Sequence, residues 1–116
     1  MIKKKFNNWA KTTACKPKNY YTPTSEKELQ QIINTCIKNK TPYKVCGKRH
    51  SYNSIFHNHH NGILISLKKF NKIKNIDPST KIVTFEAGVS TPQLLLALKK
   101  HHLTIHCSVS SLFGFF

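Results

Sequence analysis

The sequence predicts a domain of the α+β (mixed α/β) class, because segments of helical and of strand character alternate along it. The helical evidence is clearest after Ser25, where apolar residues recur at helical spacing. The strand evidence comes from short apolar runs that are separated by turn-forming residues. A chain of 116 residues suits one small domain, and we see no repeat or linker that divides residues 1–116.

The first helix is expected to begin at Ser25. Ser25 and Glu28 have the spacing of a capping box, in which each side chain satisfies a backbone N–H at the helix start. The predicted apolar face consists of Leu29, Ile32, Ile33, Cys36 and Ile37. The helix should end before Pro42, because the residue that precedes a proline avoids helical geometry.

Apolar runs of strand length follow this helix. They are Tyr43–Cys46, Ile63–Leu67, Ile73–Ile76 and Lys81–Glu86. The polar segment His57–Gly62 is expected to form a surface turn, and Asp77–Ser79 is expected to form another. Ser90 then offers a capping hydroxyl ahead of Pro92, which predicts a second, leucine-rich helix up to Lys100.

The formal net charge of +15 comes almost entirely from lysine, since Arg49 is the only arginine. One explanation is a partner rich in phosphate, such as nucleic acid. However, proteins that bind phosphates and bases usually favour arginine, whose planar group pairs bidentately. The lysines here are scattered among asparagine and isoleucine, so we favour a compositional bias over nucleic-acid binding. A small basic nucleic-acid-binding protein stays open as an alternative.

The cysteines and the first residues bear on location. Cys15, Cys36, Cys46 and Cys107 are widely spaced, and no apolar run follows the lysines at positions 3–5 as a secretory signal requires. No stretch approaches the roughly 20 apolar residues of a membrane-spanning helix. We therefore expect a cytoplasmic protein with reduced thiols and no transmembrane segment.

The sequence gives little support for a metal site or for the active site of a hydrolase. The histidines gather at His57, His59 and His60 and again at His101, His102 and His106. No pair of cysteines at zinc-site spacing accompanies either group, so we expect polar surface turns and no metal site. With only four acidic residues, neither paired carboxylates nor a Ser-His-Asp triad can be assembled, and catalytic residues stay unknown.

The segment Gly47–Ser51, directly after the strand Tyr43–Cys46, carries the strongest functional signal. A glycine at a strand end allows a turn with positive φ, where a side chain would clash. The amides that follow can then point together into a nest for phosphate. His50 and a small hydroxyl residue complete the loop. The pattern therefore predicts a site for a phosphorylated cofactor beside an imidazole.

Several segments, taken together, resemble a known family. They are Phe6–Ala10, Cys15–Pro17, Tyr21–Ser25, Gly47–Ser51, Gly62–Ile65 and Val83–Gly88. In this order they resemble the amino-terminal FAD-binding region of the sugar-lactone and alditol oxidases, within the flavoprotein class typified by p-cresol methylhydroxylase (PCMH) and vanillyl-alcohol oxidase. The resemblance covers about Phe6 to Leu103. It implies that residues 17–116 form the first subdomain of a PCMH-type FAD-binding domain.

The resemblance also implies roles for individual residues. The residues that would hold FAD are Cys46, Gly47, Lys48, Arg49, His50, Ser51 and Asn53. His50 matches the histidine that members of the family bond covalently to the 8α-methyl carbon of the flavin. Ser51 and Asn53 would donate hydrogen bonds to the FAD pyrophosphate, and Arg49 would complement its charge. Family members oxidise an alcohol group of a sugar lactone or polyol by hydride transfer to the flavin.

The final segment departs from the family. Cys107–Ser111 keeps the start of a serine- and glycine-rich pattern, and the sequence then stops at Phe116. The resemblance therefore implies a truncated family member whose substrate domain is absent. A sugar-lactone or polyol substrate would require that missing part, and so would the catalytic residues over the flavin ring. A non-catalytic remnant is the other alternative.

Overall fold

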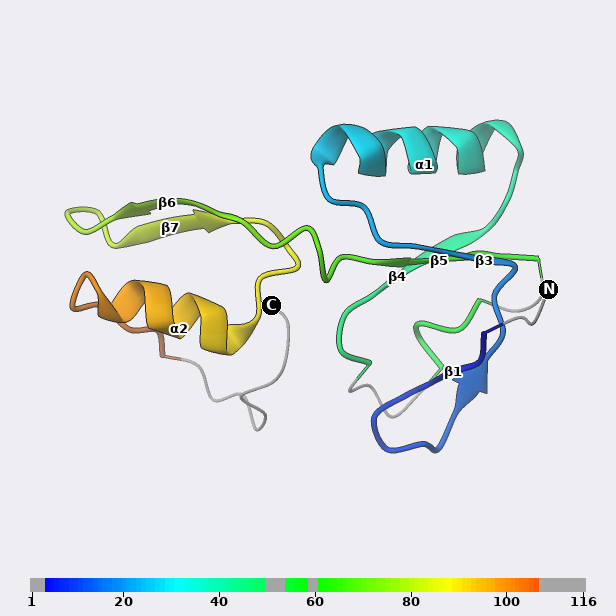
Figure 1. The fold of residues 1–116 in the computed structure, drawn as a ribbon, viewed down its shortest axis with the longest axis horizontal. Helices are drawn as coiled ribbons and strands as arrows, with labels where there is room; N and C mark the ends of the chain where they lie inside the picture. Colours follow the sequence, from blue (N-terminus) through cyan, green and yellow to red (C-terminus); the bar gives the residue numbers. More distant parts are fainter. Residues whose placement is uncertain (1–3, 50–53, 59–60, 107–116) are drawn as a thin grey trace.

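A computed structural model describes residues 4–49, 54–58 and 61–106. Figure 1 shows two lobes side by side, and the predicted mixed class of helices and strands is confirmed. The first lobe holds β1 (Phe6–Asn7), β2 (Ala14–Cys15), β3 (Asn19–Tyr21), α1 (Glu26–Lys38), β4 (Tyr43–Cys46) and β5 (Ile63–Ser66). The second holds β6 (Ile73–Asp77), β7 (Ile82–Phe85) and α2 (Thr91–Lys99). In the part of the chain described, neither helix has the length and apolar character needed to cross a membrane.

A parallel sheet in the order β3-β5-β4 organises the first lobe. The central strand β5 pairs with both neighbours, and Leu64 lies opposite Tyr20 on one side and Lys44 on the other. All four residues of β5 are buried, as expected for a parallel strand that is covered on both faces. Because the three strands run the same way, their carboxyl ends meet at one edge of the sheet.

Helix α1 covers one face of this sheet. Cys36, Leu29, Ile32 and Ile33 pack against Ile63 and Ile65 of β5. The prediction that Ile37 belongs to the buried face is wrong, because its side chain is 63% exposed. Ile37 lies at the border of the apolar stripe, and a sheet of three strands is too narrow to cover the whole stripe.

The start of α1 is capped largely as predicted. The Ser25 hydroxyl accepts a hydrogen bond from the Glu28 N–H at 3.2 Å. The Glu28 carboxylate, however, reaches one residue further back than a capping box requires. It accepts from the N–H and the hydroxyl of Thr24, at 2.8 and 3.0 Å. Both capping interactions are therefore present, but the Glu28 carboxylate bonds Thr24 in place of Ser25.

The β1–β2 hairpin and the segment 54–58 cover the opposite face of the sheet. The buried residues of this second cluster are Phe6, Cys15, Cys46, Phe56 and Leu64, with Tyr20 packed against them. The strands β1, β2 and β3 were not predicted from the sequence, and they have only two or three residues each. Strands this short carry no periodicity that a sequence pattern can reveal.

The predicted surface turn over residues 57–62 is wrong for its first two residues, because the side chains of His57 and Asn58 are buried. The Asn58 amide donates to the backbone carbonyls of Pro42 and Ile63, both at 2.9 Å. A Cβ atom on Gly62 would lie 2.0 Å from the Asn58 side chain. The asparagine therefore ties β5 to the segment before β4, and glycine at position 62 makes room for it.

Replacing Asn58 by alanine should lower the free energy of unfolding by about 2 kcal/mol. The change removes two hydrogen bonds of about 1 kcal/mol each and leaves their carbonyl acceptors without the amide. Denaturant unfolding followed by circular dichroism measures the loss. Asn61→Ala is the matched control, because Asn61 is exposed in the same segment. Equal stability of the two variants would show that the Asn58 hydrogen bonds contribute nothing.

In the second lobe, the β6–β7 hairpin packs against α2. Val89, Leu94 and Leu98 form its core, and Ile73, Ile76, Val83 and Phe85 of the hairpin pack against them. Ser90 caps α2 as predicted, since its hydroxyl accepts from the Gln93 N–H at 3.4 Å. The predicted turn after β6 is also confirmed, because Asp77 accepts from the Ser79 N–H at 2.9 Å.

The Asp77 turn gives a prediction about pH. Hydrogen bonds from the Ser79 hydroxyl and from Thr80 stabilise the ionised carboxylate and lower its pKa from 3.8 to about 2. Because the pKa is lower in the folded chain, the carboxylate stabilises the turn above pH 3.8 and this contribution is lost as the pH falls towards 2. Ser79→Ala should raise the pKa towards its ordinary value in an NMR titration of the carboxyl carbon. An unchanged pKa would contradict this account.

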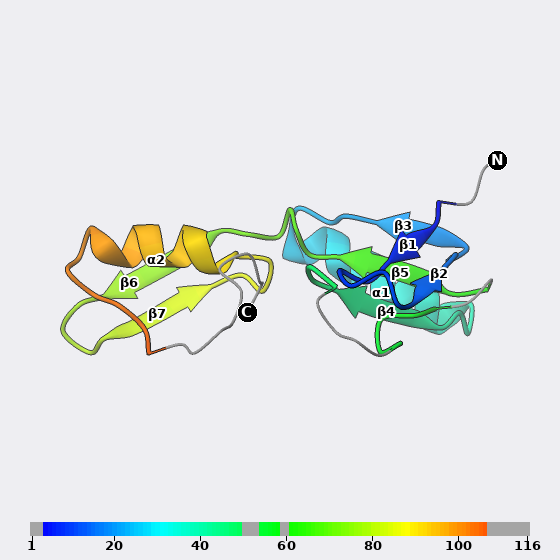
Figure 2. The ribbon, with the colours of Figure 1, turned by 90° about the horizontal axis from the view of Figure 1, so that it is seen from below.

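A short junction joins the two lobes, where the segment after β5 contacts the segment after β7 (Figure 2). The Gly88 N–H donates to the Phe70 carbonyl at 2.8 Å. The Lys72 N–H donates to the buried carboxylate of Glu86 at 2.7 Å, and the Glu86 N–H donates back to the Lys72 carbonyl at 2.8 Å. The segment that links the lobes is therefore held by hydrogen bonds to the segment after β7.

Candidate functional site

The candidate site lies at the carboxyl edge of the parallel sheet. Cys46 at the end of β4 lies opposite Ser66 at the end of β5, so the loops after both strands leave from the same edge. In Figure 1 this edge faces the second lobe. Open α/β sheets bind their ligands outside the carboxyl ends of their strands, which makes this edge the expected place for a cofactor.

The backbone of the loop after β4 differs from its sequence-based prediction. No glycine in the described ranges has a positive φ, so Gly47 does not make the expected left-handed turn. Arg49 does so instead, with φ 60°. A residue with a side chain adopts this conformation at a cost in free energy. Backbone nests for anions alternate right- and left-handed residues, so Arg49 provides the conformation that was expected of Gly47.

Contacts with the β1–β2 hairpin hold Arg49 in place. The Trp9 N–H donates to the Arg49 carbonyl at 2.7 Å. The guanidinium carbon of Arg49 lies 5.5 Å from the centre of the Phe6 ring, within the range of a cation–π interaction. The Arg49 side chain is consequently half-buried, whereas Gly47 and Lys48 are exposed.

Cys46 is directed into the core. Burial raises the pKa of its thiol, and the charge of Arg49 and a hydrogen bond with Ser66 oppose this shift in part. The thiol is therefore protonated at neutral pH and is a poor nucleophile. The Cys46 side chain packs with Phe6 and Leu64. Only the backbone of Cys46 is therefore available to contact a cofactor at this edge.

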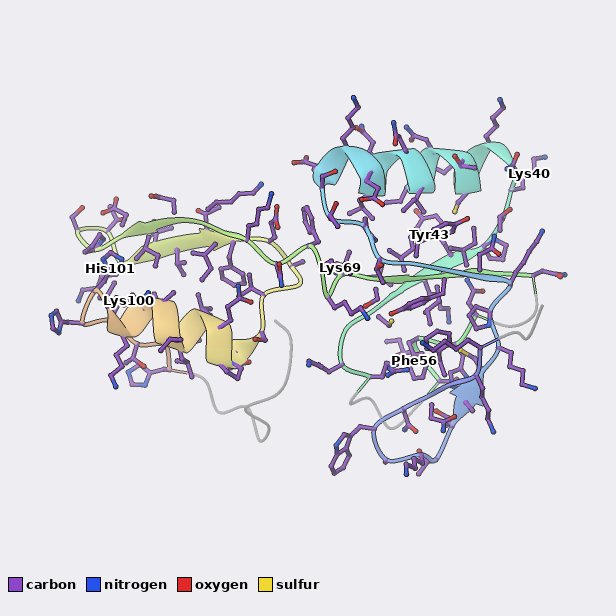
Figure 3. The ribbon with its side chains drawn as sticks, in the orientation of Figure 1. Lys40, Tyr43, Phe56, Lys69, Lys100 and His101 are labelled. Carbon is purple, nitrogen blue, oxygen red and sulfur yellow. The ribbon has the colours of Figure 1, made fainter. Side chains whose placement is uncertain are left out.

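The charge around the edge is positive. Lys48 precedes Arg49 on the loop after β4, and Lys68 and Lys69 lie exposed on the loop after β5. Figure 3 shows Lys69 between the lobes. Of the four acidic residues, two lie in the first turn of α1 and Asp77 ends β6, while the carboxylate of Glu86 is buried and accepts the Lys72 N–H. The edge is therefore suited to an anionic ligand.

Three predicted site residues, His50, Ser51 and Asn53, lie outside the described residues, as do His59, His60 and Cys107. The other predicted members, Cys46 to Arg49, are consecutive at the edge. Of the remaining histidines, His101, His102 and His106 are exposed as expected. Within residues 4–49, 54–58 and 61–106, no three histidine, cysteine or acidic residues gather as a metal site requires.

A groove between α1 and the strands β3 and β5 is a separate feature. It is lined by Tyr21, Gln31, Ile32, Thr35 and Ile63 and has a volume of about 170 Å³. Pockets that hold cofactors usually measure about 300–1,000 Å³. The groove is too small for a dinucleotide, and its lining contains no residue of the loops at the carboxyl edge.

A comparison with protein-family models finds the FAD binding domain over residues 17–114, most of the chain. The chain belongs to this family. FAD is therefore its cofactor, and the fold matches the amino-terminal part of the PCMH-type domain.

Three relatives illustrate the similarity. L-gulonolactone oxidase of Mus musculus is 36% identical over 100 residues, which cover 86% of this chain and 22% of the mouse enzyme. L-gulono-1,4-lactone dehydrogenase of Mycobacterium tuberculosis is 29% identical over 83 residues, or 72% of this chain and 19% of that enzyme. The 4-cresol dehydrogenase flavoprotein subunit of Pseudomonas putida is 27% identical over 97 residues, which cover 82% of this chain and 19% of that subunit. The chain thus spans about a fifth of the length of these relatives.

The residues present fit the anionic part of FAD. A left-handed turn at Arg49, an exposed glycine and nearby lysines are suited to the two negative charges of a pyrophosphate. Phe6 and Trp9 were not predicted as neighbours of this loop, because no sequence signal links them to Arg49. Lys68 and Ser66 at the end of β5 were missed too, although a parallel pairing of the two predicted strands would have brought them to the same edge.

Proposed function

We propose that this chain supplies the FAD-binding part of an oxidoreductase that acts on a CH–OH group of a sugar lactone or polyol. The observation that carries the proposal is the position of Gly47–Arg49, at the carboxyl edge of a parallel sheet within the segment that matches the family. The names of the lactone oxidase and dehydrogenase relatives favour this substrate class over others.

In this proposal the residues of the chain bind and orient the cofactor. The amides of the loop and the ammonium group of Lys48 bind the pyrophosphate, and Ser51 and Asn53 donate further hydrogen bonds. The imidazole nitrogen of His50 would bond to the 8α-methyl carbon of the flavin; the methyl group and the imidazole would each lose a proton, and dioxygen would take up the two electrons left on the flavin. When bound, FAD supplies the redox chemistry by accepting a hydride from the alcohol carbon and passing its electrons to dioxygen or another acceptor. The catalytic groups over the flavin ring are not assigned to residues of this chain.

The attachment can be tested on a denaturing gel. The chain is expressed with FAD, and flavin fluorescence that stays with the unfolded protein band reports a covalent bond. His50→Ala should abolish this fluorescence, because the imidazole forms the bond. His101→Ala is the matched control, since His101 is an exposed histidine of the other lobe (Figure 3). Equal fluorescence in the two variants would exclude His50 as the attachment site.

Binding measurements on the wild-type chain distinguish this proposal from the alternative of nucleic-acid binding. A lysine-rich surface that binds nucleic acid has an affinity that falls steeply with salt and does not depend on the cofactor loop. Wild-type chain that retains no flavin, covalently or otherwise, while binding nucleic acid in this manner would contradict the proposed function.

A further inference from the structure

The β1–β2 hairpin contacts the cofactor loop although the two lie far apart in sequence. One contact is the hydrogen bond from the Trp9 N–H to the Arg49 carbonyl, at 2.7 Å. The other places the Arg49 guanidinium carbon 5.5 Å from the centre of the Phe6 ring. The backbone and the side chain of Arg49 are thus both held by the same hairpin.

Phe6 is a fixed platform for this contact. Its side chain is only 5% exposed, and its ring centre lies 4.6 Å from that of Tyr20. In the hairpin, Phe6 lies opposite Cys15, and both belong to the cluster that covers Leu64 of the central strand. Because these contacts fix the position of the Phe6 ring, the ring determines where the Arg49 guanidinium lies.

Arg49 needs such support because of its backbone. Its φ of 60° is unfavourable for a residue with a side chain, and its neighbours Gly47 and Lys48 are exposed. A strained conformation persists only where surrounding contacts determine it. The contacts of Arg49 with Phe6 and Trp9 can supply this support.

We propose that Phe6 is a positioning residue of the FAD site and acts through Arg49. Its ring holds the guanidinium, the guanidinium keeps Arg49 in the left-handed conformation, and that conformation orients the loop amides towards the pyrophosphate. The proposal rests on the proposed function, and it gives Arg49 a different role from direct pairing with the phosphates. Lys48 then carries the charge that faces the cofactor.

A double-mutant cycle on FAD affinity tests the proposal in the full chain. Phe6→Leu and Arg49→Met should each raise the dissociation constant of FAD about threefold to tenfold, the range of a partly buried cation–π contact. The double variant should bind FAD as tightly as the single variant with the lower affinity, because both substitutions remove the same interaction between Phe6 and Arg49. Phe6→Tyr, which keeps the ring face, should bind FAD like the wild type. Additive losses, or unchanged affinity in Phe6→Leu, would overturn the proposal.

A second measurement needs no flavin. Hydrogen exchange of the Trp9 amide should be faster in both Phe6→Leu and Arg49→Met, because its acceptor is the Arg49 carbonyl. The amides of β5 are the internal control, since a general loss of stability would speed their exchange as well. Unchanged exchange at Trp9 would overturn the coupling between Phe6 and the loop. If the wild type binds no FAD, the proposed function fails, and the exchange at Trp9 still decides whether this coupling exists.

Discussion

Gly88→Ala should strongly destabilise the second lobe, because an added Cβ atom would overlap the backbone. A Cβ atom at position 88 would lie 1.7 Å from the Leu67 carbonyl oxygen and 2.5 Å from the Phe70 carbonyl oxygen. Both are backbone atoms in the junction between the lobes, so they cannot rotate away as a side chain would. The Gly88 N–H also donates to the Phe70 carbonyl, and this hydrogen bond must lengthen if the backbone shifts.

We expect the free energy of unfolding to fall by at least about 2 kcal/mol, within the range for overpacked sites that force the backbone to move. Chemical denaturation followed by circular dichroism measures this change. Ala87→Ser is the matched control, because it adds one heavy atom at the exposed neighbouring position. A Gly88→Ala variant as stable as Ala87→Ser would show that the junction is not closely packed.

Lys48→Glu should weaken FAD binding about tenfold to a hundredfold. Hydrogen bonds to charged groups contribute about 1.5–3 kcal/mol, and the variant replaces an attractive charge with a repulsive one. The midpoint of thermal unfolding of the variant is measured alongside, so that a loss of binding is distinguished from a loss of stability.

Lys74→Glu is the control for this experiment. Lys74 lies exposed on β6 in the other lobe, and its replacement changes the net charge by the same amount (Figure 1). FAD affinity is measured by isothermal titration calorimetry at constant salt. An equal loss in both variants would indicate general attraction to a basic chain, and the loop would then have no specific role.

The sequence predicted those parts of the fold that depend on local physics. Ser25 and Ser90 cap the helices because hydroxyl groups satisfy backbone amides over a distance of a few residues. The strand Tyr43–Cys46 was also recognisable, because turn-forming residues bound its apolar run. Each of these features is specified by residues that are neighbours in the chain.

Features that depend on tertiary contacts were not predictable from the pattern. Asn58 looked like a turn residue, but its amide is buried and donates to the carbonyls of Ile63 in β5 and of Pro42, which lies 16 residues earlier. Gly47 was expected to provide the left-handed turn, yet Arg49 adopts it with the support of Phe6 and Trp9. Local propensity favours glycine at such positions, and contacts with a remote hairpin override that preference here.

A titration of the 116-residue chain with FAD, followed by the emission of Trp9, tests the central claim most directly. Trp9 is the only tryptophan, and its backbone is hydrogen-bonded to the cofactor loop, so a flavin bound there should quench its emission by energy transfer. We expect saturable quenching by one FAD per chain and much weaker binding of riboflavin, which lacks the pyrophosphate. Quenching that does not saturate, or riboflavin binding as tight as that of FAD, would contradict a site at the Gly47–Arg49 loop.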